Sequence, residues 1–283
     1  MSRDLGAGQV QIIYCHGVPG SESDLRAAGL DSESMKRIAV LDRMAATTDT
    51  FEETFLAAFD SMRSVRNEAV FVVGFSLGAM CALRLAACRP EHVKGLALIS
   101  PAAPLELGSF LPAMAGRTVF RAAINGSASL RLLTIAQRMI VATFPVSMIR
   151  MLFAACADSD RVLLQDSNFI TALKDGLRYC LLLHPSAYRR EIDAFVKPWA
   201  NEISRVKCPV TIWQGTKDTW TPPAMAVAIR AKLGETARLH LCDGLGHYAT
   251  LRFALPLVLN DVSDVRQADR AAREQEWRST MTQ

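Results

Sequence analysis

The sequence predicts an α/β protein built on a parallel sheet that helices cover on both faces. Two observations support this fold class. Short, nearly uniform apolar runs recur along the 283 residues, and helix-like segments separate them. Uniform runs are typical of strands buried on both faces. Half of the residues are hydrophobic and 21% are charged, which excludes a disordered chain and allows a large core.

The apolar runs predict six strands. They are Gln11–Cys15, Ile38–Leu41, Val70–Val73, Leu96–Ile99, Pro209–Trp213 and Leu239–Cys242. Helices are expected over Phe51–Val65, Leu77–Cys88 and Pro222–Leu233, where the prolines fall in the first turn and no N–H bond is lost. This alternation predicts a doubly wound sheet of six strands, all parallel.

Residues 101–205 break the alternation, because they carry no strand signal and read as several helices. A crossover between parallel strands needs only about a dozen residues. We therefore predict a helical cap inserted over one end of the sheet; the alternative is a helical layer of the same domain. The predicted division is a core of residues 1–100 and 206–263, the cap at 101–205, and a polar C-terminal helix or tail at 264–283.

Composition restricts the environment and partners. The uncharged apolar run at residues 69–83 is too short to span a membrane, and Met1–Gly8 lacks the apolar core of a signal peptide. Seven cysteines form no C-x-x-C pair, which favours reduced thiols in the cytoplasm. A net charge of +4 without a basic run predicts no nucleic-acid partner.

The strongest motif is Gly74-Phe75-Ser76-Leu77-Gly78, which follows an apolar strand and opens a helix. A sharp turn at this point would expose the Ser76 hydroxyl, and Gly74 and Gly78 would leave room for the turn. The Leu77 N–H would then point at developing negative charge from the helix N-terminus. Ser76 is the predicted nucleophile, and an ordinary glycine-rich turn is the alternative.

A second glycine-rich loop, His16-Gly17-Val18-Pro19-Gly20, follows the first strand. Its backbone can face a ligand, and the Val18 N–H is the candidate second oxyanion donor. The loop has no G-K-[ST] and is not a phosphate-binding P-loop. We expect His16 to shape the loop rather than to act as a base.

A serine nucleophile requires a base and an acid that orients the base. Among five histidines, His247 follows the last strand in a glycine-rich loop, at the sheet edge where sites form. Asp218 follows the fifth strand in the same way. Asp42 and Asp243 lie at the ends of their own strands and have no loop that could carry them to the histidine. The histidine and cysteine spacings match no metal site, so neither a metal nor a cofactor is predicted.

The chain order Ser76, Asp218, His247, together with both glycine-rich loops, resembles the α/β-hydrolase family. This resemblance implies a nucleophilic serine, an acyl-enzyme, hydrolysis by water and a helical lid. The family usually has two further strands before the oxyanion loop, for which this chain has no room. We therefore expect a shortened sheet whose new edge is covered by the C-terminal segment or by a second subunit in a homodimer.

The resemblance predicts a serine esterase acting on a carboxylic ester or thioester with an apolar acyl or aromatic group. A serine at the elbow, where haloalkane dehalogenases and epoxide hydrolases have an aspartate, argues against those enzymes. C–C bond hydrolases and acyltransferases share the same parts and stay open as alternatives. So does a non-catalytic, hydrolase-like small-molecule binding protein.

The predicted cap is basic and apolar. Residues 107–157 contain five arginines, no lysine and no acidic residue, among many large apolar side chains. We expect amphipathic helices with an adaptable apolar lining suited to acyl or aromatic substrates. Docking on an anionic membrane surface or on an acidic carrier is a secondary hypothesis.

Overall fold

The computed structural model describes residues 11–45, 50–62 and 69–262. Six strands form one sheet in the order β2-β1-β3-β4-β5-β6, and every neighbouring pair is parallel. The strands are β1 (Gln11–Cys15), β2 (Ile38–Val40), β3 (Val70–Phe75), β4 (Val93–Ile99), β5 (Val210–Gly215) and β6 (Ala237–Cys242). The predicted six-stranded parallel sheet is confirmed, with β3 running two residues further than expected.

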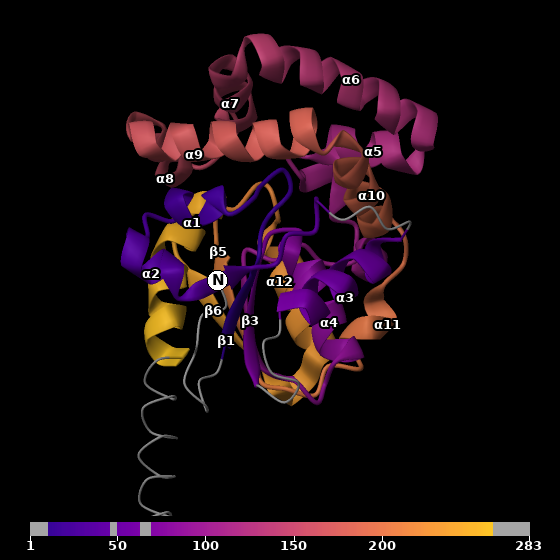
Figure 1. Cartoon of the computed structure of the whole chain (residues 1–283), viewed down its shortest axis with the longest axis vertical. Helices are drawn as coiled ribbons and strands as arrows, with labels where there is room; N and C mark the ends of the chain where they lie inside the picture. The colour runs from indigo at the N-terminus through magenta and orange to yellow at the C-terminus, as the bar shows by residue number, and fades with distance from the viewer. Residues whose placement is uncertain (1–10, 46–49, 63–68, 263–283) are drawn as a thin grey trace, which may run out of the picture.

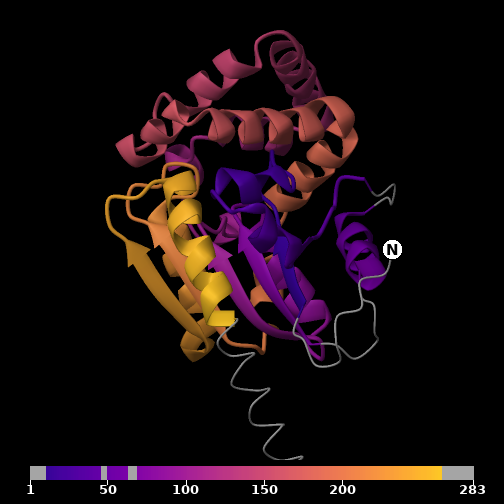
Figure 2. The same ribbon diagram turned by 60° about the vertical axis from the view of Figure 1, so that its left-hand side comes forward.

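Helices cover both faces of this sheet (Figures 1 and 2). One face carries α3 (Phe51–Met62), α4 (Gly78–Cys88), α11 (Ala200–Ile203) and α12 (Pro223–Leu233), which contact one another in that order. The opposite face carries a helix over residues 247–262. Two short helices, α1 (Ser23–Ala27) and α2 (Ser32–Lys36), lie between β1 and β2. Residues 63–65 of the helix predicted at Phe51–Val65 lie outside the described residues.

The expectation that every strand is buried on both faces is wrong for β6. Arg238, His240 and Leu241 are exposed, because β6 is an edge strand. His240 is exposed, and its ring stacks on Trp213 at a centroid distance of 4.4 Å. At the other edge β2 is only three residues long, which limits the open edge left by the shortened sheet.

Residues 101–205, called the helical layer below, contain no strand. Apart from α11, their helices lie across the carboxyl ends of the strands (Figure 1). Its main helices are α5 (Arg117–Ile124), α6 (Ser127–Thr143), α7 (Pro145–Phe153), α8 (Asp158–Val162), α9 (Ser167–Arg178) and α10 (Pro185–Val196). A π-helical turn over Tyr179–Leu183 joins the last two. The predicted domain boundaries stay a prediction, and residues 264–283 lie outside the described chain.

A buried ion pair joins the helical layer to the sheet. Arg43, in the loop after β2, donates from Nε and Nη2 to the two carboxylate oxygens of Glu191 on α10, at 2.9 Å each. The side chains are 0% and 1% exposed. Arg43 Nη2 also donates to the carbonyl oxygen of His16 at 2.9 Å. The pair therefore fixes α10 against the loop that follows β1.

Candidate active site

Ser76 occupies a sharp turn between the end of β3 and the start of α4. Its φ is +55°, a left-handed conformation that is costly for a residue with a side chain. Surrounding backbone holds it there: the Ser76 N–H donates to the Ile99 carbonyl, and Ala79 and Ala102 donate to the Ser76 carbonyl, each at 3.1 Å. The turn is as sharp as the motif predicted, but Ser76 is only 7% exposed and lines a cavity instead of the open surface.

The two motif glycines are required by close backbone approach. A Cβ on Gly78 would lie 2.1 Å from the carbonyl oxygen of Cys15, and one on Gly74 would lie 2.8 Å from Cα of Ala79. Neither backbone can move without displacing β1 or α4. Glycine is therefore needed at both positions to bring the helix N-terminus beside the first strand.

The predicted oxyanion donors lie on either side of Ser76. Leu77 immediately precedes α4, and Val18 lies in the loop after β1. Within the described residues neither N–H has a protein acceptor. The loop that holds Val18 is fixed one residue earlier, where the Gly17 N–H donates to Asp24 Oδ2 at 2.8 Å. Both N–H groups are consequently free for a ligand oxygen.

His247 and Asp218 form a buried hydrogen-bonded pair. The distance from His247 Nδ1 to Asp218 Oδ2 is 2.8 Å, and the residues are 2% and 4% exposed. Thr221 Oγ1 and Gln214 Nε2 also donate to Asp218 Oδ2, and the N–H groups of residues 220 and 221 donate to Oδ1. Burial alone would raise the pKa of Asp218, but His247 and these donors outweigh it and lower the pKa.

His247 does not lie in a free loop, as the sequence suggested, but begins the helix over residues 247–262. Asp160 of α8 caps this helix: its carboxylate accepts the N–H groups of His247 at 2.7 Å and Ala249 at 2.8 Å. Ser159 Oγ accepts the Gly246 N–H at 2.9 Å. Two residues of the helical layer therefore hold the backbone of the predicted base.

Ser76 and His247 line one narrow cavity of about 30 Å³ together with Gly17, Val18 and Trp220. In the described part of the chain no hydrogen bond joins the Ser76 hydroxyl to His247. Such bonds are often long before substrate binds. The Trp220 ring stacks on His247 with a centroid distance of 5.9 Å, which fixes the plane of the imidazole.

A larger cavity of about 430 Å³ extends from Ser76 beneath the helical layer. Its lining is mostly apolar and comes from α5, α6, α7 and α10. Representative lining residues are Phe120, Leu133, Ile140, Met148, Met151 and Ile192. The flexible methionines and the size of the cavity suit an apolar group of moderate length beside the serine.

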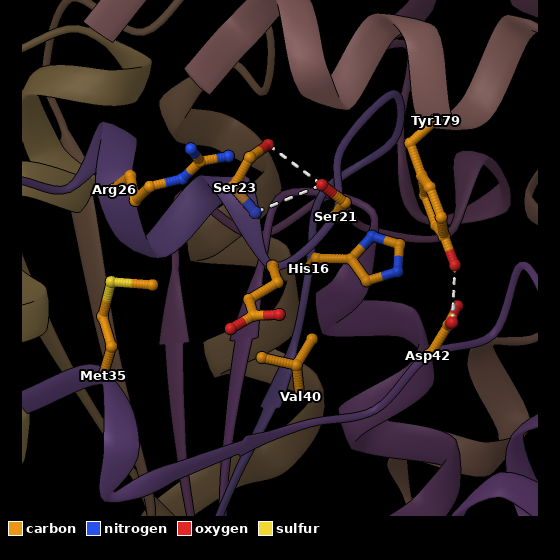
Figure 3. A pocket seen from close by; sticks show the side chains of 9 residues that line it. His16, Ser21, Ser23, Arg26, Met35, Val40, Asp42 and Tyr179 are labelled. Carbon is orange, nitrogen blue, oxygen red and sulfur yellow. Dashed lines mark hydrogen bonds between the residues drawn. The ribbon is translucent and has the colours of Figure 1, made fainter. Parts of the chain in front are cut away.

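His16 is kept away from this site. Its Nδ1 lies 2.7 Å from the Gly17 carbonyl, and burial, followed by the charge of Arg43, lowers its pKa to about 3. Figure 3 shows its ring in a separate pocket, beside the Asp42 carboxylate that accepts the Tyr179 hydroxyl at 2.5 Å. His16 is thus neutral and structural, and Asp42 is engaged away from His247.

Asp24, which fixes Gly17, introduces a pH dependence of stability. Burial raises its pKa to about 7. Between pH ~4 and ~7 the folded state then binds more protons than the unfolded state, so the free energy of unfolding falls as pH rises, by up to about 4 kcal/mol from this group. Asp24→Asn keeps an acceptor for Gly17 and cannot ionise. We expect urea denaturation to show the variant gaining stability relative to the wild type as pH rises from ~4 to ~7; a constant difference over that range would contradict this.

No three His, Cys, Asp or Glu side chains within residues 11–45, 50–62 and 69–262 gather closely enough to hold a metal ion. The sequence predicted Ser76, Asp218, His247, Val18 and Leu77 as site residues, and the structure brings all five to the same end of the sheet. It missed Gln214, Thr221 and Asp160. Thr221 lies in the same loop as Asp218, and this position is the only feature of the sequence that could have indicated its contact with Asp218.

The fold and this arrangement define an α/β protein with a serine at a strand-to-helix elbow. A family model described as the alpha/beta hydrolase fold matches residues 12–252. The chain therefore belongs to the α/β hydrolase fold family. No curated protein matches it.

Several solved structures share the fold at low sequence identity. An enol-lactonase from Burkholderia xenovorans LB400 is 14% identical with a TM-score of 0.63, covering 93% of this chain and 92% of that chain. A thermophilic esterase from Thermogutta terrifontis is 15% identical with a TM-score of 0.58, covering 94% and 90%. A bromoperoxidase from Bacillus anthracis is 14% identical with a TM-score of 0.58, covering 90% and 93%. At these identities the likeness concerns the fold alone.

Proposed function

We propose that this protein is a serine hydrolase that cleaves a carboxylic ester or thioester of an apolar acyl or aromatic substrate. One observation carries the proposal: a strained, cavity-facing Ser76 shares its cavity with the buried His247–Asp218 pair. The larger apolar cavity beside Ser76 supports an apolar substrate. The seven free cysteines support a reducing compartment, for which we propose the cytoplasm.

In the proposed reaction Ser76 Oγ attacks the substrate carbonyl carbon while His247 Nε2 takes the hydroxyl proton. Asp218 holds the Nδ1–H tautomer and stabilises the imidazolium that forms. The Val18 and Leu77 N–H groups donate to the oxyanion. The acyl C–O or C–S bond then breaks, and the leaving group takes the proton from His247. Water, deprotonated by His247, attacks the acyl-enzyme and releases the acid and Ser76.

The proposal is tested by covalent labelling of the full chain with a fluorophosphonate probe and by hydrolysis of p-nitrophenyl butyrate. Mass spectrometry should place the label on Ser76. Ser100 is an internal control: it has a similar φ of +46° after β4 but is fully buried, and it should stay unlabelled. Labelling of another residue would overturn the assignment of Ser76 as the nucleophile. No labelling together with no hydrolysis would favour a non-catalytic binding protein.

The esterase and the enol-lactonase among the similar folds make esters and lactones the first substrates to assay. Thioesters and C–C substrates of varying chain length complete the panel. Transfer of the acyl group to added alcohols or amines would instead identify an acyltransferase. These assays separate the reactions that a shared set of residues allows.

A further inference from the structure

Exposed apolar side chains are concentrated on the helical layer. Nine of the thirteen large hydrophobic residues exposed in the described chain lie there, although the layer holds less than half of the described residues. They are Ile124, Leu132, Ile135, Met139, Ile140, Phe144, Met151, Val162 and Leu183. Scattered exposure is ordinary in soluble proteins, but a concentration on one part of the surface indicates a contact site.

The centre of this surface is α6, which forms the outer edge of the molecule opposite the sheet (Figure 1). Leu132, Ile135 and Met139 are 70%, 44% and 64% exposed. Their i, i+3, i+7 spacing places them on one helix face. Phe144, at the end of α6, is 66% exposed. Within the described chain no single helix is long and apolar enough to cross a bilayer. Taken together, α6 and α7 have the required length and apolar composition, but they are bent by 117° where they meet.

The same surface is positively charged without compensation. Arg117, Arg121, Arg131 and Arg150 are exposed, and residues 107–157 contain no acidic side chain. None of these arginines forms an ion pair within the described residues, whereas Arg26 and Arg252 do. A partner that matches this surface must therefore offer both negative charge and an apolar region.

An anionic lipid bilayer meets both requirements. A second copy does not, because a two-fold contact through α6 would bring the same uncompensated arginines together. We propose that the helical layer docks on an anionic membrane surface, with the Leu132–Ile135–Met139 stripe and Phe144 inserted among the lipid chains and the arginines at the headgroups. This is the geometry of an amphipathic helix that lies in the membrane plane.

Two of the exposed apolar residues of the helical layer also line the cavity beside Ser76. Ile140 and Met151 line that cavity and are also 39% and 59% exposed. Docking would then bring this part of the cavity lining close to the lipid. An apolar substrate could enter without crossing water; this consequence rests on the proposed function, whereas docking itself does not.

The test is co-sedimentation of the full chain with vesicles of phosphatidylcholine alone or mixed with phosphatidylglycerol, at low and high salt. We expect binding only to the anionic vesicles and weaker binding at high salt. Leu132→Ser/Met139→Ser and Arg131→Glu/Arg150→Glu should each weaken binding, and the arginine pair should lower the vesicle partition coefficient by at least about 30-fold. Val227→Ser/Leu241→Ser, exposed on α12 and β6, is the matched control and should bind as the wild type.

Leu132 and Met139 do not line the cavity, so Leu132→Ser/Met139→Ser should hydrolyse a soluble short ester at the wild-type rate. That measurement, with an unchanged Tm, shows that the variant is folded. If p-nitrophenyl butyrate is not hydrolysed at all, the proposed function fails while vesicle binding still decides the docking. The docking proposal is overturned by no binding to anionic vesicles at low salt or by variants that bind as the wild type. A wild-type dimer that Leu132→Ser/Met139→Ser converts to a monomer would overturn it too, by assigning the surface to a second copy.

Discussion

Replacing Ser76 with alanine is expected to lower kcat for ester hydrolysis by roughly 10⁴- to 10⁶-fold. In the proposed mechanism the serine and its base act as a unit, because His247 has no proton to take once the hydroxyl is absent. Ser76→Ala/His247→Ala should therefore be no slower than Ser76→Ala. Steady-state kinetics with p-nitrophenyl butyrate measure both rates.

Stability supplies the control for that experiment. The side chain of Ser76 makes no hydrogen bond in the described structure, so alanine should leave the urea midpoint nearly unchanged. A Ser76→Ala variant that folds and retains a tenth of the wild-type rate would contradict the assigned nucleophile. Independent losses in the two single variants that multiply in the double variant would contradict the assigned base.

Replacing Glu191 with glutamine is expected to lower the free energy of unfolding by about 3–5 kcal/mol. The carboxylate is 1% exposed, and its removal leaves the buried charge of Arg43 without a counterion. The loss should be measurable by urea denaturation. Because Arg43 also donates to His16, the loop bearing Val18 should lose order, and kcat should fall as well.

Two comparisons make the Glu191 result specific. Arg43→Met/Glu191→Leu removes both charges and should recover much of the lost stability, since apolar pairs often replace buried ion pairs without loss. Asp175→Asn breaks the exposed Arg26–Asp175 pair and should cost less than about 1 kcal/mol. Equal effects from Asp175→Asn and Glu191→Gln would show that burial does not determine the contribution of the pair.

The sequence predicted the parts of the site that depend on short segments. A strand followed at once by a glycine-rich turn predicts Ser76, Val18 and Leu77 as neighbours, because parallel strands bring their carboxyl ends to one edge. Strand ends were less well defined: β3 continues through Gly74 to Phe75. Edge position was not predictable from composition, so β6, apolar in sequence, was wrongly expected to be buried on both faces.

Contacts between distant segments could not be predicted. Arg43 and Glu191 are 148 residues apart, and neither has a local signal for an ion pair. Asp160 lies 87 residues before His247 and reads in sequence as an ordinary residue of a polar helix. Such pairs arise when the helical layer packs on the sheet, and a single sequence does not determine that packing.

The cap that Asp160 provides limits how this protein can be re-engineered or can diverge. Exchange of the segment between β4 and β5 is an obvious route to a new substrate range, since this segment lines most of the large cavity. A donor segment without a carboxylate at the corresponding place would leave the first N–H groups of the helix that starts at His247 without acceptors. The segment therefore cannot be exchanged freely. A functional chimera must supply its own hydrogen-bond acceptor for the first N–H groups of that helix.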